Sequence, residues 1–271
     1  MEHHLSPFGE LVNRLLGPLV LPLLEALGYH PHNRAEPIPD HIATQLLIAL
    51  FAVVFTLWFR RRLSAENPGG LQLCLEQALS NSFRVGFHDL LDGIVGHGGR
   101  KYLAFVGTVG LFVLLCNAIS LIPLFTSPTA VHTVPLGCAL SVFLYYHVAG
   151  IRAHGPIGYG KHFMGPVPLL AILMVPIELI SHTARLLSLT VRLFVNMTVS
   201  EFLYVQFLNL GVLLVVGLWK INALLGIVSA VVPLVFPPLF VGLHIFVAFI
   251  QALVFTILPV VYISGAVAHE H

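Results

Sequence analysis

Charged residues are scarce in this sequence. Its 271 residues include 13 Lys and Arg and 12 Asp and Glu, so that 9% are charged and 57% are hydrophobic. Soluble domains carry about 25% charged residues, nearly three times this share. A chain this poor in charge cannot cover its surface as a soluble domain does. The composition therefore predicts a polytopic membrane protein.

Cysteine motifs and nucleotide-binding loops are also lacking. Cys74, Cys116 and Cys138 form no pairwise motif, which argues against a disulfide framework and a thiolate metal site. The only candidate phosphate loop, GYGK at 158–161, lacks the Walker spacing. The start has no charged region, short apolar core and cleavage site, so we expect Met1 to be retained. We expect no bound nucleotide, cofactor or metal, and no nucleic-acid partner.

The N-terminal half divides into an outer segment, one span and a loop. Residues 42–59 are apolar and just long enough for a bilayer core of ~30 Å. Three arginines follow at 60–62, which by the positive-inside rule places residues 1–41 outside. Residues 60–101 then form a cytoplasmic loop. Leucine and phenylalanine at a spacing of four predict an amphipathic helix on the membrane surface within this loop.

Two further spans are predicted within residues 102–150. The second span runs outward and the third returns. Arg152 and Lys161 fall in the loop that follows the third span, and they place that loop inside again. The same alternation puts the C-terminus in the cytoplasm.

The C-terminal part, 166–268, contains two apolar stretches of about fifty residues each. A helix of that length measures ~75 Å, more than twice the hydrocarbon thickness. Each stretch is therefore either two spans or one long helix lying far from the membrane normal. Proline residues within both stretches permit either arrangement. A polar WKIN segment at 219–222 is the turn candidate between them.

Polar side chains form a stripe along the first of these stretches. On a helical wheel at 100° per residue they lie near one direction, and the opposite face is Leu, Ile and Val. Ionisable residues within a membrane usually face protein or water and mark ion pathways. The stripe consists of Glu178, His182, Arg185, Arg192, Asn196 and Ser200, with Ser181 and Ser188 beside it.

The two stretches have matching polar residues if they form an antiparallel hairpin. In such a hairpin, facing residues lie at equal distances in sequence from the turn. Arg192 paired with Gln251, and Glu201 paired with His244, both centre the turn near Asn222, within WKIN. This agreement favours an all-α fold with a long, strongly tilted helical hairpin.

The two arginines of the stripe allow different explanations. Arg185 could be a structural residue that reaches the interface or joins a fixed ion pair. Arg192 has no carboxylate on its stripe within four positions. Placing an unpaired Arg at the centre of a membrane helix costs ~2.5–3.5 kcal/mol on insertion scales. We therefore expect the counter-ion of Arg192 to come from another subunit.

RLLSLTVRLFVNMTVSE, followed by HIFVAFIQALVFTILPVVYIS, strongly resembles subunit a of the F-type rotary ATP synthases. GRKYLAFVGTVGLFVLLCNAISLIP and the C-terminal His-Glu-His extend the resemblance over roughly residues 40–271. It implies that Arg192 is the essential stator arginine. Departures are the valine at 195, often glycine in relatives, and the extra charges His182 and Arg185, which add to the stripe.

The resemblance also implies roles for the remaining polar residues and a setting for the chain. Glu201 and His244 would lie towards the outer half-channel, in the arrangement typical of bacterial members, while Glu178 and Ser188 would lie towards the cytoplasmic side. The other implied residues of the ion path are Asn196 and Gln251. The implied partners are the c-subunit ring, the b-subunit peripheral stalk, the rest of the complex and membrane lipid, in a bacterial plasma membrane. The chain itself would bind no nucleotide.

Two other functions remain open on the residues alone. A haem electron-transfer protein could use membrane histidines such as His182 and His244, although the hairpin register holds these two apart. A secondary transporter usually shows related broken helices, and the sequence has no internal repeat. Histidines near the N-terminus are more often solvated than bound to metal; these are His3, His4, His30, His32 and His41.

Overall fold

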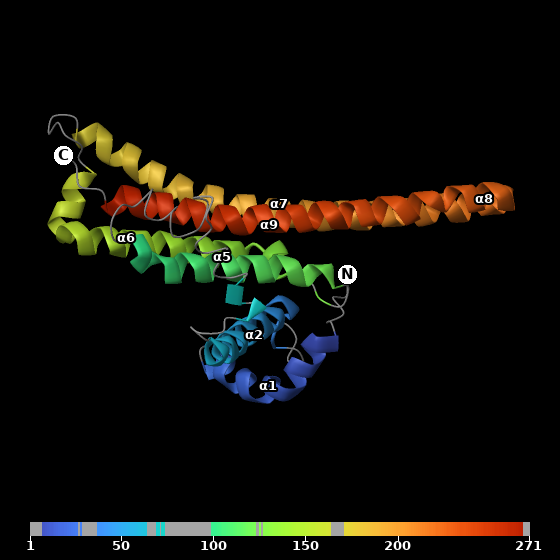
Figure 1. Ribbon diagram of the computed structural model, residues 1–271, viewed down its shortest axis with the longest axis horizontal. Coiled ribbons are helices and arrows are strands. Elements are labelled where there is room, and N and C mark those ends of the chain that lie inside the picture. Colours follow the sequence, from blue (N-terminus) through green and yellow to red (C-terminus); the bar gives the residue numbers. More distant parts are fainter. Residues whose placement is uncertain are drawn as a thin grey trace. The chain divides into compact units, whose positions relative to one another are not determined.

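All the secondary structure that the computed structural model describes is helical (Figure 1). The structure describes residues 7–26, 28, 37–63, 69–70, 72–73, 99–122, 125, 127–163 and 171–267. Most of the predicted surface helix in the 60–101 loop lies outside these residues. The C-terminal His-Glu-His and all of the N-terminal histidines except His41 lie outside them too.

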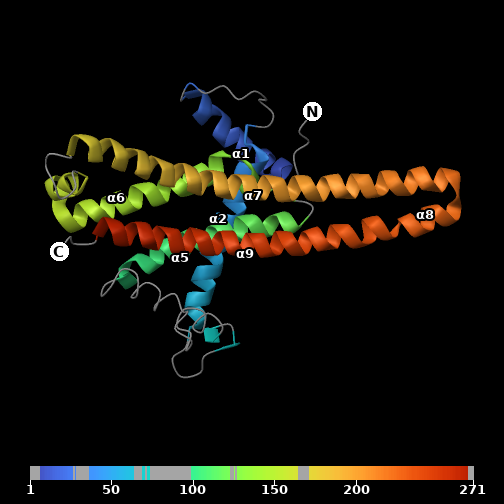
Figure 2. The same cartoon turned by 90° about the horizontal axis from the view of Figure 1, so that it is seen from above.

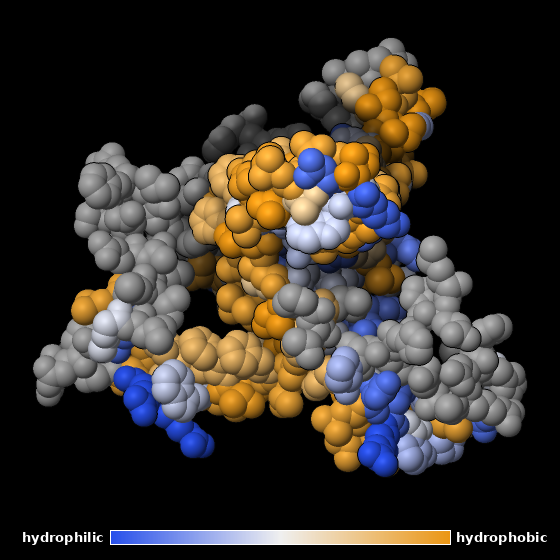
Figure 3. All heavy atoms as spheres, turned by 90° about the vertical axis from the view of Figure 1, so that its right-hand side faces the viewer, coloured by the Kyte–Doolittle hydropathy of each residue, from blue (hydrophilic) through white to orange (hydrophobic). Residues whose placement is uncertain are grey.

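Among the described residues, five helical segments are long and apolar enough to cross a membrane. They are Asp40–Arg62, Leu103–Leu121, Thr133–Lys161, Ala171–Ile221 and Ala223–Val267. This confirms the predicted all-α, polytopic class. Hydrophobic residues also make up most of the drawn surface in the view that faces the α8 end (Figure 3).

Contacts divide the chain into two compact units, which we describe separately. The first unit comprises Met1–Leu47, Leu114–Val134 and Arg192–Gln251. The second comprises Ile48–Val113, Pro135–Val191 and Ala252–His271. The long C-terminal helices contribute residues to both units.

The N-terminal part of the first unit contains helix α1 (Pro7–Ala26). The buried Asn13 amide donates to the Ile38 carbonyl at 2.8 Å, and its oxygen accepts from the Ile38 N–H at 2.9 Å. This pair of bonds ties α1 to the segment before α2 (Asp40–Arg62). Helix α2 starts on an acidic residue and ends on three arginines, which suits the helix dipole at both ends. It contains the predicted span 42–59.

Helix α7 (Ala171–Ile221) is a single helix of 51 residues. At 1.5 Å per residue it measures ~77 Å, so it can remain within a hydrocarbon layer of ~30 Å only by lying far from the membrane normal. Pro176 lies inside the helix without ending it. The long-helix alternative is therefore correct, and the division of this stretch into two spans is wrong.

The hairpin turn falls at Asn222, as the register predicted. Helix α7 ends at Ile221, and the Asn222 side chain accepts a hydrogen bond from the Leu224 N–H at 2.9 Å, capping α8 (Ala223–Ser229). Asparagine is a favourable N-cap because its oxygen satisfies an otherwise free backbone donor. Helix α9 (Val231–Val267) then returns antiparallel to α7 (Figure 2).

Close packing sets the spacing of the hairpin legs in the first unit. A Cβ placed on Gly211 would lie 2.9 Å from Pro233 Cβ, so the absence of a side chain lets the two helices approach. One turn further from the tip, the Phe207 ring stacks on Phe240 at 4.5 Å and lies 6.0 Å from Phe236. These contacts agree with the register that pairs Glu201 with His244.

The second unit is organised around α5 (Leu103–Ala118) and α6 (Thr133–His162). The α5 helix is preceded by the 3-10 turn Gly99–Tyr102 and followed by Ile119–Leu121. A further 3-10 turn, Pro128–Ala130, precedes α6. The Phe105 ring stacks on Tyr145 with centroids 3.7 Å apart, which joins the two helices in this unit.

The structure corrects the predicted end of the third span. Arg152 and Lys161 were expected in a loop, but both lie in α6, which continues to His162. The helix is interrupted at Gly155, where φ is 72°. Glycine adopts this angle without steric cost, and the following Pro156 suits the first turn of a new helical segment. Gly155 and Pro156 therefore mark a sharp bend within the helix.

Candidate functional site

The predicted site residues form two clusters, one in each unit. The first-unit cluster contains Arg192, Asn196, Glu201, His244 and Gln251. The second-unit cluster contains Glu178, His182, Arg185 and Ser188. Helix α7 carries most of both clusters.

Arg192 lies on an exposed face of α7. Val195 and Val199, at its i+3 and i+7 positions, are 42% and 47% exposed, whereas Leu193 and Met197 are fully buried. Arg192 forms no ion pair or hydrogen bond with any residue that the structure describes. The helix thus presents a guanidinium beside small apolar side chains.

Two hollows adjoin the other polar residues of this cluster. One, of about 240 Å³, is lined by Asn196, Ser200 and His244 among apolar side chains. The other, of about 90 Å³, is lined by Glu201, Tyr204, Ser120 and again His244. The predicted Glu201–His244 pairing is thus seen as two side chains on one hollow. At ~30 Å³ per molecule, the larger hollow has room for about eight waters.

His244 is held in place by the end of α5 and the turn that follows it. The imidazole is 8% exposed, and its Nε2 lies 2.8 Å from Ser120 Oγ and 3.4 Å from the Asn117 carbonyl. The Ser120 hydroxyl is also within 2.7 Å of the same carbonyl. One imidazole nitrogen therefore has a fixed partner on another helical element.

Glu201 lies beside a chain of hydrogen bonds through buried hydroxyl groups. Its carboxyl group is close to Ser127. Ser127 Oγ lies 2.9 Å from Thr129 Oγ1, and the Thr129 hydroxyl donates to Asn117 Oδ1 at 2.7 Å. Because Thr129 donates its one proton to Asn117, Ser127 is the donor in its contact with Thr129.

Gln251 is almost completely buried, with 2% of its surface exposed. Its Oε1 has no hydrogen-bond partner within the described part of the chain. The hairpin register pairs Gln251 with Arg192, but the two are not hydrogen-bonded there. Gln251 therefore keeps an unused acceptor in the interior of the first unit.

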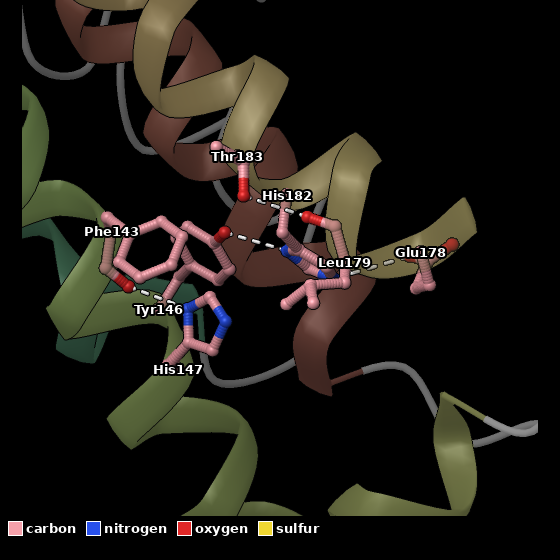
Figure 4. A network of polar contacts seen from close by, with 7 residues as sticks. All are labelled: Phe143, Tyr146, His147, Glu178, Leu179, His182 and Thr183. Atoms are coloured by element: carbon pink, nitrogen blue, oxygen red, sulfur yellow. Dashed lines mark hydrogen bonds and ion pairs between the residues drawn. The ribbon is translucent and has the colours of Figure 1, made fainter. Parts of the chain in front are cut away.

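In the second unit, His182 links two other polar side chains (Figure 4). Its Nδ1 lies 2.7 Å from the Tyr146 hydroxyl, and its Nε2 lies 3.3 Å from Glu178 Oε1. His182 and Tyr146 are 6% and 1% exposed, whereas the Glu178 side chain is 38% exposed. The three residues thus form a connected path from an accessible carboxylate to a buried hydroxyl.

Aromatic rings enclose the His182 imidazole. Ring centroids lie 5.5 Å away in Tyr146, 5.0 Å in His147 and 5.1 Å in Phe163. His147 is itself oriented by a contact of 2.8 Å between its Nδ1 and the Phe143 carbonyl (Figure 4). Both nitrogens of His182 have partners, which leaves neither available as a haem ligand.

Arg185 and Ser188 are the remaining two residues of the second-unit cluster. The Arg185 guanidinium sits 5.4 Å from the centre of the Tyr262 ring on α9, in cation–π geometry. This contact gives Arg185 an aromatic partner within the second unit, which differs from the fixed ion pair that one sequence-based explanation required. Ser188 is exposed.

Sequence reasoning missed the partners of both clusters. Tyr146 and His147 were not singled out, although polar residues near the end of a predicted span were a usable signal. The same holds for the polar residues near the end of the second span and after it, which are Asn117, Ser120, Ser127 and Thr129. Within the described residues, no three His, Cys, Asp or Glu side chains gather as a metal site.

These observations define a class of protein, namely an all-helical, multi-pass membrane protein with ionisable side chains built into its spans. Comparison with known proteins narrows the class. A family model described as ATP synthase A chain matches residues 42–264. The chain therefore belongs to the ATP synthase A chain family. It is a non-catalytic subunit of the ATP synthase, the proton-translocating stator subunit of the membrane sector.

Bacterial relatives cover nearly all of the chain. It is 43% identical to ATP synthase subunit a of Solibacter usitatus, over 88% of this chain and 91% of that protein. It is 39% identical to ATP synthase subunit a of Koribacter versatilis over the whole of both chains. With the subunit of Campylobacter jejuni it shares 39% over 83% of this chain and 88% of that protein.

Proposed function

We propose that Arg192 is the fixed stator cation that receives each rotor carboxylate in turn. The observation that supports this most is its exposure on α7 without a partner among the described residues. A bare cation on a membrane helix is costly, so a counter-ion must be supplied. The ring of c-subunits, each with one carboxyl group at mid-membrane, would supply it. The exposed valines beside Arg192 would let the ring pass closely.

Arginine suits this role better than lysine. Its guanidinium stays charged at any accessible pH, whereas a desolvated lysine loses its proton readily. A rotor carboxyl group can face lipid only when it is protonated, because a bare carboxylate in hydrocarbon is too costly. Arg192 would therefore mark the one place where the ionised carboxylate is tolerated. Its charge would also oppose direct passage of a proton from one half-path to the other.

The outer half-path would run through the hollows of the first-unit cluster. Glu201 and His244 line a hollow together, and Asn196 borders the adjoining one. Water in these spaces would carry protons between Glu201 and the rotor, with His244 as a second relay because an imidazole can both accept and donate a proton. The buried Gln251 Oε1, which has no partner among the described residues, would accept a hydrogen bond from a water molecule on this path.

The cytoplasmic half-path would use the second-unit cluster. Glu178 is the accessible end, and His182 is in contact with it. Ser188, exposed on the same helix, would lie along the way to Arg192. Arg185 would shape the local field from its position over Tyr262 rather than meet the rotor. At 150 mV, each proton would release ~3.5 kcal/mol to drive rotation.

The proposed setting is a bacterial plasma membrane, with the N-terminus outside and the C-terminus in the cytoplasm. Three arginines at the end of α2 support this orientation through the positive-inside rule. The relatives that match most or all of the chain are bacterial. Besides the c-ring, the proposed contacts are the b-subunit peripheral stalk, the rest of the complex and lipid.

The test is Arg192→Ala in the assembled complex. We expect ATP synthesis and ATP-driven proton pumping in membrane vesicles to be abolished, while the amount of assembled complex stays close to wild type. Arg192→Lys controls for loss of charge alone and should also fail to support coupled transport. Unchanged coupled pumping in Arg192→Ala would refute the proposed role.

A further inference from the structure

A hollow in the second unit lies away from both polar clusters. It has a volume of about 280 Å³ and lies between the start of α5 and the late part of α6. Two aromatic rings, two cations and two small residues form most of its wall: Tyr102, Tyr145, Lys101, Arg152, Ala149 and Ala153. Neither Lys101 nor Arg152 has an ion-pair partner among the described residues.

The walls of the hollow hold its shape. The Tyr145 ring stacks on Phe105 at 3.7 Å and meets the Tyr102 ring edge-on at 6.3 Å, which gives a rigid aromatic floor. The Lys101 ammonium lies 4.9 Å from the centre of the Tyr102 ring, so that a cation–π contact keeps it at the rim. Ala149 and Ala153, one turn apart on α6, leave the space open because their side chains are short.

The hollow lies at the end of two membrane spans. Lys101 immediately precedes α5, and Arg152 lies just before the bend of α6 at Gly155. The adjoining face of α6 is apolar and exposed, with Leu144 55%, Val148 44% and Ile151 42% accessible. A charged recess thus continues directly into a lipid-facing surface.

We propose that this hollow binds the phosphate headgroup of an anionic phospholipid. Two cations that face one space repel each other, and a phosphate between them would neutralise that repulsion. Basic pockets between membrane helices near the cytoplasmic surface favour anionic lipid headgroups. The acyl chains would lie along the exposed face of α6, which a free phosphate ion would leave uncovered. This site is independent of the role proposed for Arg192.

Binding is measured on the purified, delipidated complex by titration with phosphatidylglycerol, counting retained lipid by native mass spectrometry. Each surface cation contributes about fivefold in affinity. Lys101→Gln and Arg152→Gln should therefore each weaken retention about fivefold, and the double variant about 25-fold. Lys101→Arg should bind like wild type. The matched control, Arg60→Gln with Arg61→Gln, removes two cations from the end of α2 and should leave retention unchanged.

A steric variant separates the hollow from general charge effects. Ala153→Leu keeps both cations but fills the space, and it should lower retention at least as much as either single charge variant. Wild-type retention in Ala153→Leu or in the double variant would overturn the proposal, as would an equal loss in the Arg60/Arg61 control. Displacement of the lipid by millimolar inorganic phosphate would show an ion site instead. If the double variant fails to assemble, Lys101→Gln and Ala153→Leu decide.

Discussion

The two polar clusters use a carboxylate and an imidazole in different ways. In the first unit, Glu201 and His244 come from two helices and border a shared hollow. In the second, Glu178 and His182 are four residues apart on one helix and touch at 3.3 Å. In the first arrangement, water can occupy the space between the groups. In the second, a proton would pass from group to group through direct contacts.

The surroundings of the two imidazoles show the same contrast between open space and direct contact. His244 has a serine hydroxyl and a backbone carbonyl beside it, and it borders open space. His182 has partners on both nitrogens and is enclosed by rings. Where a hollow is open, water can move in and take the place of a relay group that has been removed. In an enclosed chain of side chains, water cannot replace a missing group. The comparison therefore suggests that single substitutions disturb the two half-paths in different ways.

The largest effect among relay residues is expected at Glu201. Glu201→Gln removes the group that gains and loses the proton, and positioned acid–base groups contribute on the order of a hundredfold or more. We expect Glu201→Gln to lower the rate of coupled pumping about a hundredfold. His244→Ala should lower this rate about tenfold, because water can fill the hollow. Both variants should remain coupled. Wild-type pumping rates in both would remove them from the path.

In the second-unit cluster, removal of the Tyr146 hydroxyl tests whether protons pass along its contact with His182. Tyr146→Phe deletes only the hydrogen bond to His182 Nδ1, a contact worth about 1 kcal/mol, or about fivefold in rate. His182→Ala should be more severe, because it removes both links of the chain. Tyr145→Phe, which keeps the stacked ring and does not touch His182, is the matched control. Equal rates in Tyr146→Phe and Tyr145→Phe would separate this hydroxyl from proton passage.

Arg185 should tolerate change better than Arg192. Its contact with the Tyr262 ring is of a kind worth ~0.5–1 kcal/mol at partly exposed sites, or about two- to fivefold. We expect Arg185→Gln to lower pumping by no more than this and to keep it coupled. Complete loss of pumping in Arg185→Gln, with Arg192→Ala still active, would show that the two arginines have been assigned the wrong roles.

The last prediction concerns the packing between the two legs of the hairpin, where the expected effect is on stability and not on pumping. A methyl group on Gly211 would press against Pro233, and overpacking of this kind costs ~1–3 kcal/mol. Gly211→Ala should lower the melting temperature of the solubilised complex. Gly217→Ala, on the same helix with open space around the added Cβ, is the control and should not. A melting temperature equal to wild type in Gly211→Ala would show that the legs of the hairpin can separate without cost.

Much of the fold could be predicted because the polar residues of two separate stretches of the sequence indicate the same turn. The polar stripe on α7 and the polar residues of α9 place the turn on the same residue, Asn222, and the structure puts it there. The bend at Gly155 was not readable, because glycine followed by proline marks a loop as well as a helix interruption.

The candidate site, like the fold, could be predicted from the sequence only in part. The stripe on α7 is a property of one helix, so the sequence located it. The partners of its residues lie on other elements, as Tyr146 does relative to His182 and Ser127 relative to Glu201. These pairings depend on which faces of different helices meet. No local pattern in a single sequence records that choice.

The central claim is that Arg192 meets the rotor. A structure of the assembled complex in a lipid bilayer, resolved well enough to place side chains, tests it most directly. The account predicts the Arg192 guanidinium facing the ring, within about 3 Å of a rotor carboxylate or of a water bound to it. A guanidinium that lies against lipid, or that is paired with a carboxylate of its own chain and turned away from the ring, would contradict it.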